Sequence, residues 1–112
     1  ANPTWMRDFL QVCLDKGRKS EVRQLAERAQ NELLPETDSE LKYYQGTLLA
    51  ACGEKEIANK FLAKAVDEKY CAYQALQADP LLSGVQSDPG FRQIVAAAEA
   101  CQKKFLAEQG GH

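Results

Sequence analysis

Small and apolar residues recur along the first two thirds of this chain at a spacing of 36 positions. Gly17 and Gly53 are 36 positions apart (53 − 17), and the same offset aligns three further pairs of small or apolar residues: Val22 with Ala58, Ala26 with Leu62, and Ala29 with Ala65. A fixed period of about 20 to 50 residues is typical of repeat proteins, in which each unit buries its apolar face against the next unit. The spacing therefore predicts a stack of small, similar units.

Each unit contains two segments with the apolar spacing of a helix. In the first segment Trp5, Met6, Phe9 and Cys13 recur every three or four residues behind the helix opening Asn2-Pro3. Three more such stripes follow, over residues 20–33, 37–52 and 57–66. The segment 20–33 is expected to begin at the cap Ser20, and the segment 37–52 at a Thr37/Glu40 capping box. The expected buried stripe of 37–52 consists of Leu41, Tyr44, Leu48, Leu49 and Cys52. Because glycine readily ends a helix and turns the chain, Gly17 and Gly53 are expected to join antiparallel helix pairs.

The last third of the chain departs from the repeat. Residues 70–78 predict one short helix, and Asp79-Pro80 and Asp88-Pro89 each combine an acidic cap with proline at a first helical position. The second of these pairs opens a final helix that runs to about residue 108. Its apolar stripe consists of Phe91, Ile94, Val95, Ala98, Cys101 and Phe105. No strand-like alternation occurs, so the expected class is all-α.

These features resemble the tetratricopeptide repeat, a helix-turn-helix unit of about 34 residues. The second unit carries the resemblance best, through Gly46, Leu49, Gly53, Ala58, Leu62 and Ala65. The first matches at Met6, Phe9, Cys13, Gly17, Ala26 and Ala29, but Leu10 and Val22 replace the usual small residues. The resemblance implies one domain over 1–112, with repeats at 1–35 and 36–69, a degenerate last unit and capping helix at 70–108, and a disordered tail at 109–112.

The implied fold is a right-handed α-superhelix like the C-terminal end of a bacterial tetratricopeptide array. Such arrays often follow a signalling or transcription-regulating domain, so the resemblance implies part of a larger regulatory protein. In the family, the first helix of each unit lines a concave groove that holds a peptide. The corresponding residues here are Arg7, Gln11 and Leu14 in the first unit and Tyr43, Thr47 and Ala50 in the second.

The resulting hypothesis is a protein-interaction module that binds a peptide or partner protein. The alternative is a structural or self-association segment, because Trp5 and Met6 stand at an N-terminal edge that a second copy could cover. The oligomeric expectation is a monomer or a weak homodimer. With a single histidine and no phosphate loop or nucleophile motif, neither an enzyme nor a cofactor or metal site is expected.

Charge and hydropathy narrow the partners further. The net charge is -2 and basic residues alternate with acidic ones, which argues against nucleic acid. No apolar run is long enough for a membrane span. The four cysteines, Cys13, Cys52, Cys71 and Cys101, would also suit two disulfides. Because each lies in an expected helical region, we favour reduced, buried thiols and a cytoplasmic location.

Overall fold

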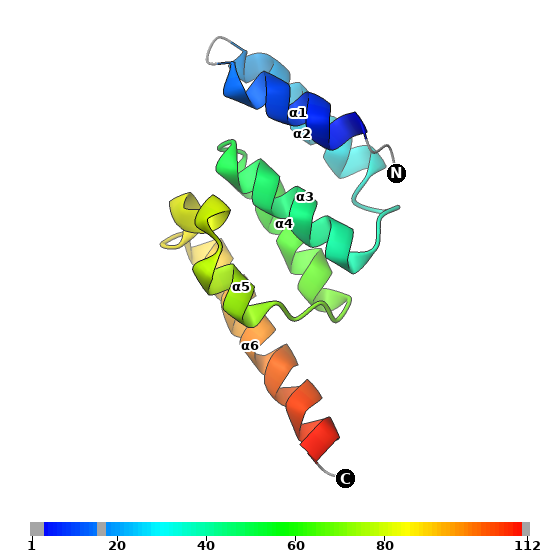
Figure 1. Cartoon of the computed structure of the whole chain (residues 1–112), viewed down its shortest axis with the longest axis vertical. Coiled ribbons are helices and arrows are strands. Elements are labelled where there is room, and N and C mark those ends of the chain that lie inside the picture. The colour runs from blue at the N-terminus through cyan, green and yellow to red at the C-terminus, as the bar shows by residue number, and fades with distance from the viewer. Residues whose placement is uncertain (1–3, 16–17, 111–112) are drawn as a thin grey trace.

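Seven helical segments follow one another along an elongated body in the computed structural model, which describes residues 4–15 and 18–110 (Figure 1). They are α1 (Thr4–Leu14), α2 (Lys19–Glu32), α3 (Ser39–Ala51), α4 (Lys55–Asp67), α5 (Tyr73–Ala78), the 3-10 helix η1 (Pro80–Val85) and α6 (Pro89–Gly110). These two ranges contain no strand, so the predicted all-α class is confirmed. The body measures 54 × 29 × 17 Å, and its radius of gyration of 14.5 Å exceeds the roughly 13 Å expected of a compact chain of this length.

Helices pack in consecutive pairs because small residues stand where they cross. α1 contacts α2, and α3 contacts α4 (Figure 1). Gly46 on α3 lies so close to α4 that a Cβ atom there would come within 2.8 Å of the Leu62 side chain. Ala58 and Ala65 on α4 are almost completely buried, as are Ala26 and Ala29 on α2. The predicted role of small residues in the helix pairs is therefore confirmed for the described part of the chain.

Gly53 makes the tight turn that the sequence predicts between α3 and α4. Its φ of +88° lies in the left-handed region, which glycine adopts without strain. The Gly53 amide donates to the Ala50 carbonyl oxygen (3.1 Å), and the Glu54 amide donates to the Leu49 carbonyl oxygen (2.9 Å). These two bonds close the end of α3 in a Schellman motif. The expectations for Asn2-Pro3 and Gly17 fall outside the described residues.

The third unit begins with α5 and η1 and continues as the long helix α6. Both predicted acidic caps are confirmed: Asp79 Oδ1 accepts a hydrogen bond from the Leu81 amide (2.9 Å), and Asp88 Oδ2 accepts one from the Phe91 amide (3.0 Å). α5 packs against α6, while η1 packs against α3. α6 ends at Gly110, beyond the predicted end at about 108, and its last turns project from the body (Figure 1).

Three predicted helix starts are displaced: those of α2 and α3 by one or two residues, and that of α5, which begins at Tyr73 instead of residue 70. α2 begins at Lys19 and has Arg18 in place of Ser20 at its cap. At α3 the cap is Asp38, whose carboxylate accepts a hydrogen bond from the Leu41 amide (2.8 Å). Thr37, the expected cap, instead turns inward and donates its hydroxyl to the Leu33 carbonyl oxygen (2.8 Å).

All four cysteines form disulfides, so the expectation of reduced thiols is wrong. Cys13 at the end of α1 is bonded to Cys52 at the end of α3, and Cys71, just before α5, is bonded to Cys101 on α6. The Cα atoms of the two pairs are 5.7 Å and 5.5 Å apart, within the normal range for disulfides. Cys13, Cys52 and Cys101 pack against the core as the helical stripes predicted, but they are only partly buried. Cys71 lies before α5 and outside the predicted helical setting.

Candidate functional site

The predicted groove residues of the first unit are exposed on one face of α1. Arg7, Gln11 and Leu14 all face solvent, and Arg7 makes only a surface ion pair with Asp8 (3.8 Å). Leu14 is 73% exposed, and Leu10, one turn earlier, is 42% exposed. Because residues four apart are neighbours on a helix, the two leucines form an apolar pair flanked by polar side chains.

The corresponding residues of the second unit are buried, contrary to the expected exposure. Tyr43, Thr47 and Ala50 are 4%, 3% and 8% exposed. α3 packs against α4, η1 and α1, whereas α1 packs against α2 and α3, so fewer faces of α3 are left open. The Thr47 hydroxyl also donates to the Tyr44 carbonyl oxygen (2.8 Å), so it turns back to its own helix. Only three of the six predicted residues therefore remain on the surface.

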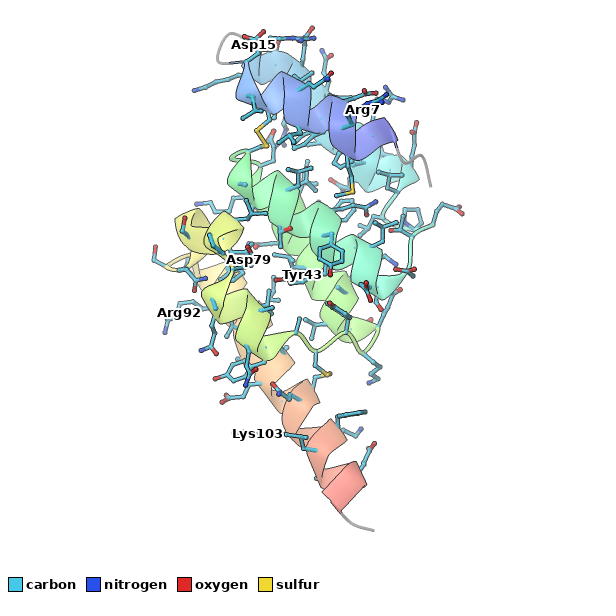
Figure 2. All side chains as sticks on the ribbon, in the orientation of Figure 1. Arg7, Asp15, Tyr43, Asp79, Arg92 and Lys103 are labelled. Atoms are coloured by element: carbon cyan, nitrogen blue, oxygen red, sulfur yellow. A yellow bond between two sulfur atoms is a disulfide. The ribbon has the colours of Figure 1, made fainter. Side chains whose placement is uncertain are left out.

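Tyr43 belongs to an internal aromatic cluster. Its hydroxyl lies 3.2 Å from Asp79 Oδ2, to which it donates, and its ring lies 5.5 Å from that of Tyr70 and 5.6 Å from that of Tyr44. Figure 2 shows Tyr43 on α3 and Asp79, between α5 and η1, well separated from Arg7 on α1. Burial, reinforced by the Asp79 carboxylate, raises the pKa of Tyr43 well above its ordinary value. Tyr43 thus links the second and third units.

The predicted self-association edge, Trp5 and Met6, is largely covered by other residues of the same chain. Trp5 is only 7% exposed, its ring stacks on Phe9 at 4.9 Å, and its indole nitrogen donates to the Leu25 carbonyl oxygen (3.2 Å). Met6 is half-buried and packs against the core. The expected exposure of Trp5 is therefore wrong, because α2 supplies the partners that we assigned to a second copy.

A buried polar network between α3 and α4 was missed from the sequence. The Lys42 side chain is 3% exposed; its ammonium donates to the Thr37 carbonyl oxygen and to Glu68 Oε1 (2.7 Å). Gln45, also buried, places Oε1 3.2 Å from the Thr37 hydroxyl. The network ties the start of α3 to the end of α4. The signal in the sequence was the helical spacing of these residues: Gln45 follows Lys42 by three positions, and the buried Leu49 follows Gln45 by four.

A second surface feature is a groove between α4 and α6. Two adjoining hollows of 460 and 520 Å³ share Val66, Asp67 and Ala97 in their linings. No residue of α1 lines either hollow, so this surface is separate from the predicted groove. The described residues contain no group of three or more His, Cys, Asp or Glu side chains that could hold a metal ion.

No family model matches the chain, and neither a curated protein nor a solved structure matches it. The class is therefore defined by the structure alone: an all-helical protein with two disulfides, one between the first two helix pairs and one within the third unit. Across the described residues, no helix is long and apolar enough to cross a membrane.

Proposed function

We propose that this chain is a protein-interaction module of the tetratricopeptide type, which binds a peptide or partner protein through the exposed face of α1. The observation that carries the proposal is the apolar pair Leu10 and Leu14, exposed side by side next to Arg7 and Gln11. Apolar side chains with a polar rim are the usual anatomy of a protein-binding surface. Arginine is also one of the residue types enriched among those that contribute most to binding, and Arg7 lies beside the leucine pair.

The helical repeat supports the tetratricopeptide assignment. Two helix pairs follow one another at a spacing of 36 residues, with Gly46, Ala58 and Ala65 at the crossing of the second pair. A third unit with a short α5 of 6 residues then closes the stack through α6. By the same resemblance, the module forms part of a larger signalling or regulatory protein.

We also propose an oxidising compartment as the location of the protein, because of its two disulfides. Structural disulfides persist in oxidising compartments and are rare in the cytoplasm. Cys13–Cys52 and Cys71–Cys101 together use every cysteine of the chain. They favour an oxidising compartment over the cytoplasmic location that reduced thiols suggested.

A random peptide-display library is the most direct test of the α1 surface. Peptides selected on the unreduced protein should bind the Leu14→Glu variant at least about tenfold more weakly, because the charge disrupts the apolar centre of the surface. Leu106→Glu is a matched control, since Leu106 is 55% exposed at the opposite end of the molecule. Equal affinity for the parent and for Leu14→Glu would refute the assignment to α1.

Sedimentation of the same proteins separates binding of a partner from self-association. A monomer at all concentrations supports the proposed module. A dimer that dissociates on Leu14→Glu substitution would instead make the leucine pair a contact between copies of the chain.

A further inference from the structure

The groove between α4 and α6 has an apolar floor of suitable shape for a helix. Val66 and Ile94 are buried at its base, while the alanines Ala63, Ala97 and Ala100 line its open sides. Small side chains at these positions leave room for another helix to approach at normal packing distance. The lining follows α6 from Gly90 to Glu108, about 27 Å at the helical rise of about 1.5 Å per residue.

The charged side chains along this groove are mainly cationic. Lys60, Lys69 and Lys104 line it, and none of the three has an ion-pair partner within the described ranges. Its two acidic residues are Asp67, which lies 3.9 Å from Lys64 outside the groove, and Glu108 at the far end. This local excess of positive charge contrasts with the net charge of -2 of the chain. The contrast favours an acidic ligand at this surface in particular.

A disulfide holds the groove in shape. Cys71 and Cys101 both line it, and their bond fixes the connection after α4 to the middle of α6. Phe105, 54% exposed, stands one turn farther along α6 in the same lining. A surface held in its bound shape loses little conformational entropy when a ligand docks.

From this combination we propose that the groove between α4 and α6 binds an acidic amphipathic helix of a partner protein. The apolar face of that helix lies on Val66, Ile94 and the alanines, and its carboxylates pair with Lys60, Lys69 and Lys104. The helix α2 of a second copy would fit less well, because its carboxylates are already paired. Glu27 pairs with Arg23 (3.6 Å) and Glu32 pairs with Arg28 (3.8 Å) on the same helix. The surface is independent of the α1 face, so each proposal can fail without the other.

Two labelled helical peptides of the length of the groove test the proposal by fluorescence anisotropy on the unreduced full chain. One carries apolar residues at helical spacing flanked by glutamates, and the other carries lysines in place of every glutamate. The acidic peptide should bind at least about tenfold more tightly, with a preference that weakens as salt is added. Equal binding of the two peptides, or no binding of either, would overturn the proposal.

Variants of the protein then locate the site. Lys60→Glu should weaken binding of the acidic peptide by about tenfold, whereas Lys19→Glu, the same change on α2 outside the groove, should leave it unchanged. Ala97→Arg should abolish binding because the arginine side chain would block the open side of the groove, with a helical signal by circular dichroism as the check on folding. If Ala97→Arg fails to fold, Lys60→Glu decides. An unaltered affinity in Lys60→Glu would overturn the site, and so would a dimer of the parent that Ala97→Arg dissociates.

Discussion

Lys69 adopts at the end of α4 the left-handed conformation that Gly53 adopts at the end of α3. Its φ is +78°, and the same pair of hydrogen bonds closes the helix: Lys69 N to Val66 O and Tyr70 N to Ala65 O, both 2.9 Å. An L-residue in this region costs about 1 to 2 kcal/mol because its Cβ crowds the following carbonyl group. The two helix ends therefore differ in strain although their hydrogen bonds match.

This difference predicts opposite effects of two substitutions. Lys69→Gly should raise the free energy of unfolding by about 1 kcal/mol, because it removes the crowded Cβ. Gly53→Ala should lower it by a similar amount, since no atom lies within 4 Å to clash and only the positive φ opposes the methyl group. Urea unfolding under non-reducing conditions measures both. A loss of stability in Lys69→Gly would show that its side chain contributes more than its backbone costs.

Tyr43 predicts a loss of stability at alkaline pH. Its pKa is raised in the folded state, chiefly by burial and then by Asp79, so the unfolded chain ionises first as the pH rises past about 10. The stabilisation is complete below that pH and is lost above it, by at most about 1.4 kcal/mol per pH unit. Tyr43→Phe should flatten this decline while costing about 1 kcal/mol near neutrality through the lost hydrogen bond.

Unfolding free energies measured from pH 8 to 11 test this account of Tyr43. Tyr44→Phe is the matched control, because Tyr44 is 47% exposed on the same helix. If the unfolding free energy of Tyr43→Phe declined as steeply with pH as that of the parent, groups other than Tyr43 would cause the decline.

Among the elements, α4 and the first part of α6 were the most predictable. The expected stripes at Phe61, Leu62 and Ala65 and at Phe91 and Ile94 are all buried. Regular apolar spacing suffices here because both helices pack on the core with one face. Phe105 belongs to the predicted stripe of α6 but is exposed, because α6 continues beyond the body that covers its earlier turns.

α3 was predicted less well because it is packed on more than one side. The expected stripe included Leu41 and Tyr44, whereas the structure buries Lys42, Gln45 and Thr47. Polar residues are rarely buried unless their hydrogen bonds are satisfied, and the partners of Lys42 come from Thr37 and Glu68, 5 and 26 positions away. Periodicity within one helix contains no information about such distant partners. The candidate groove failed in its second unit for the same reason.

The disulfides were also beyond local patterns, since four cysteines allow three pairings and helical spacing favours none of them. The two bonds act at different levels of the structure. Cys13–Cys52 spans 39 positions and links the first helix pair to the second, while Cys71–Cys101 spans 30 positions within the third unit. For loops of these lengths, the loss of entropy in the unfolded chain corresponds to about 4 kcal/mol for each bond.

Removing each bond should therefore affect different elements. The pair Cys13→Ser and Cys52→Ser should lower the free energy of unfolding by about 3 to 4 kcal/mol and speed hydrogen exchange most in α1 and α2. Besides the disulfide, the Arg23–Glu54 ion pair (3.3 Å) also connects the first two units. The pair Cys71→Ser and Cys101→Ser is the control, and should speed exchange mainly in α5 and α6. Uniform acceleration in both variants would show that the units do not unfold separately.

The molecule as a whole is an elongated stack with two candidate binding surfaces on different units. The first lies on α1 around Leu14, and the second lies between α4 and α6. Figure 1 shows α1 at one end of the stack and α6 running to the other. Between them, η1 covers α3 and interrupts the long concave groove that the repeat resemblance implied. The relative position of the two surfaces depends on how firmly the first unit is attached to the second. The covalent bond Cys13–Cys52 connects these two units.

The junction between the units thus depends on how the four cysteines pair, which peptide mapping by mass spectrometry determines. The protein is alkylated without reduction, digested and analysed for cross-linked peptides. The structure predicts one peptide pair joining Cys13 to Cys52, a second joining Cys71 to Cys101, and no alkylated cysteine. Four alkylated cysteines would contradict both disulfides and would support reduced thiols in a helical core. A bond between cysteines of the two different pairs would contradict the way in which the helical units are joined.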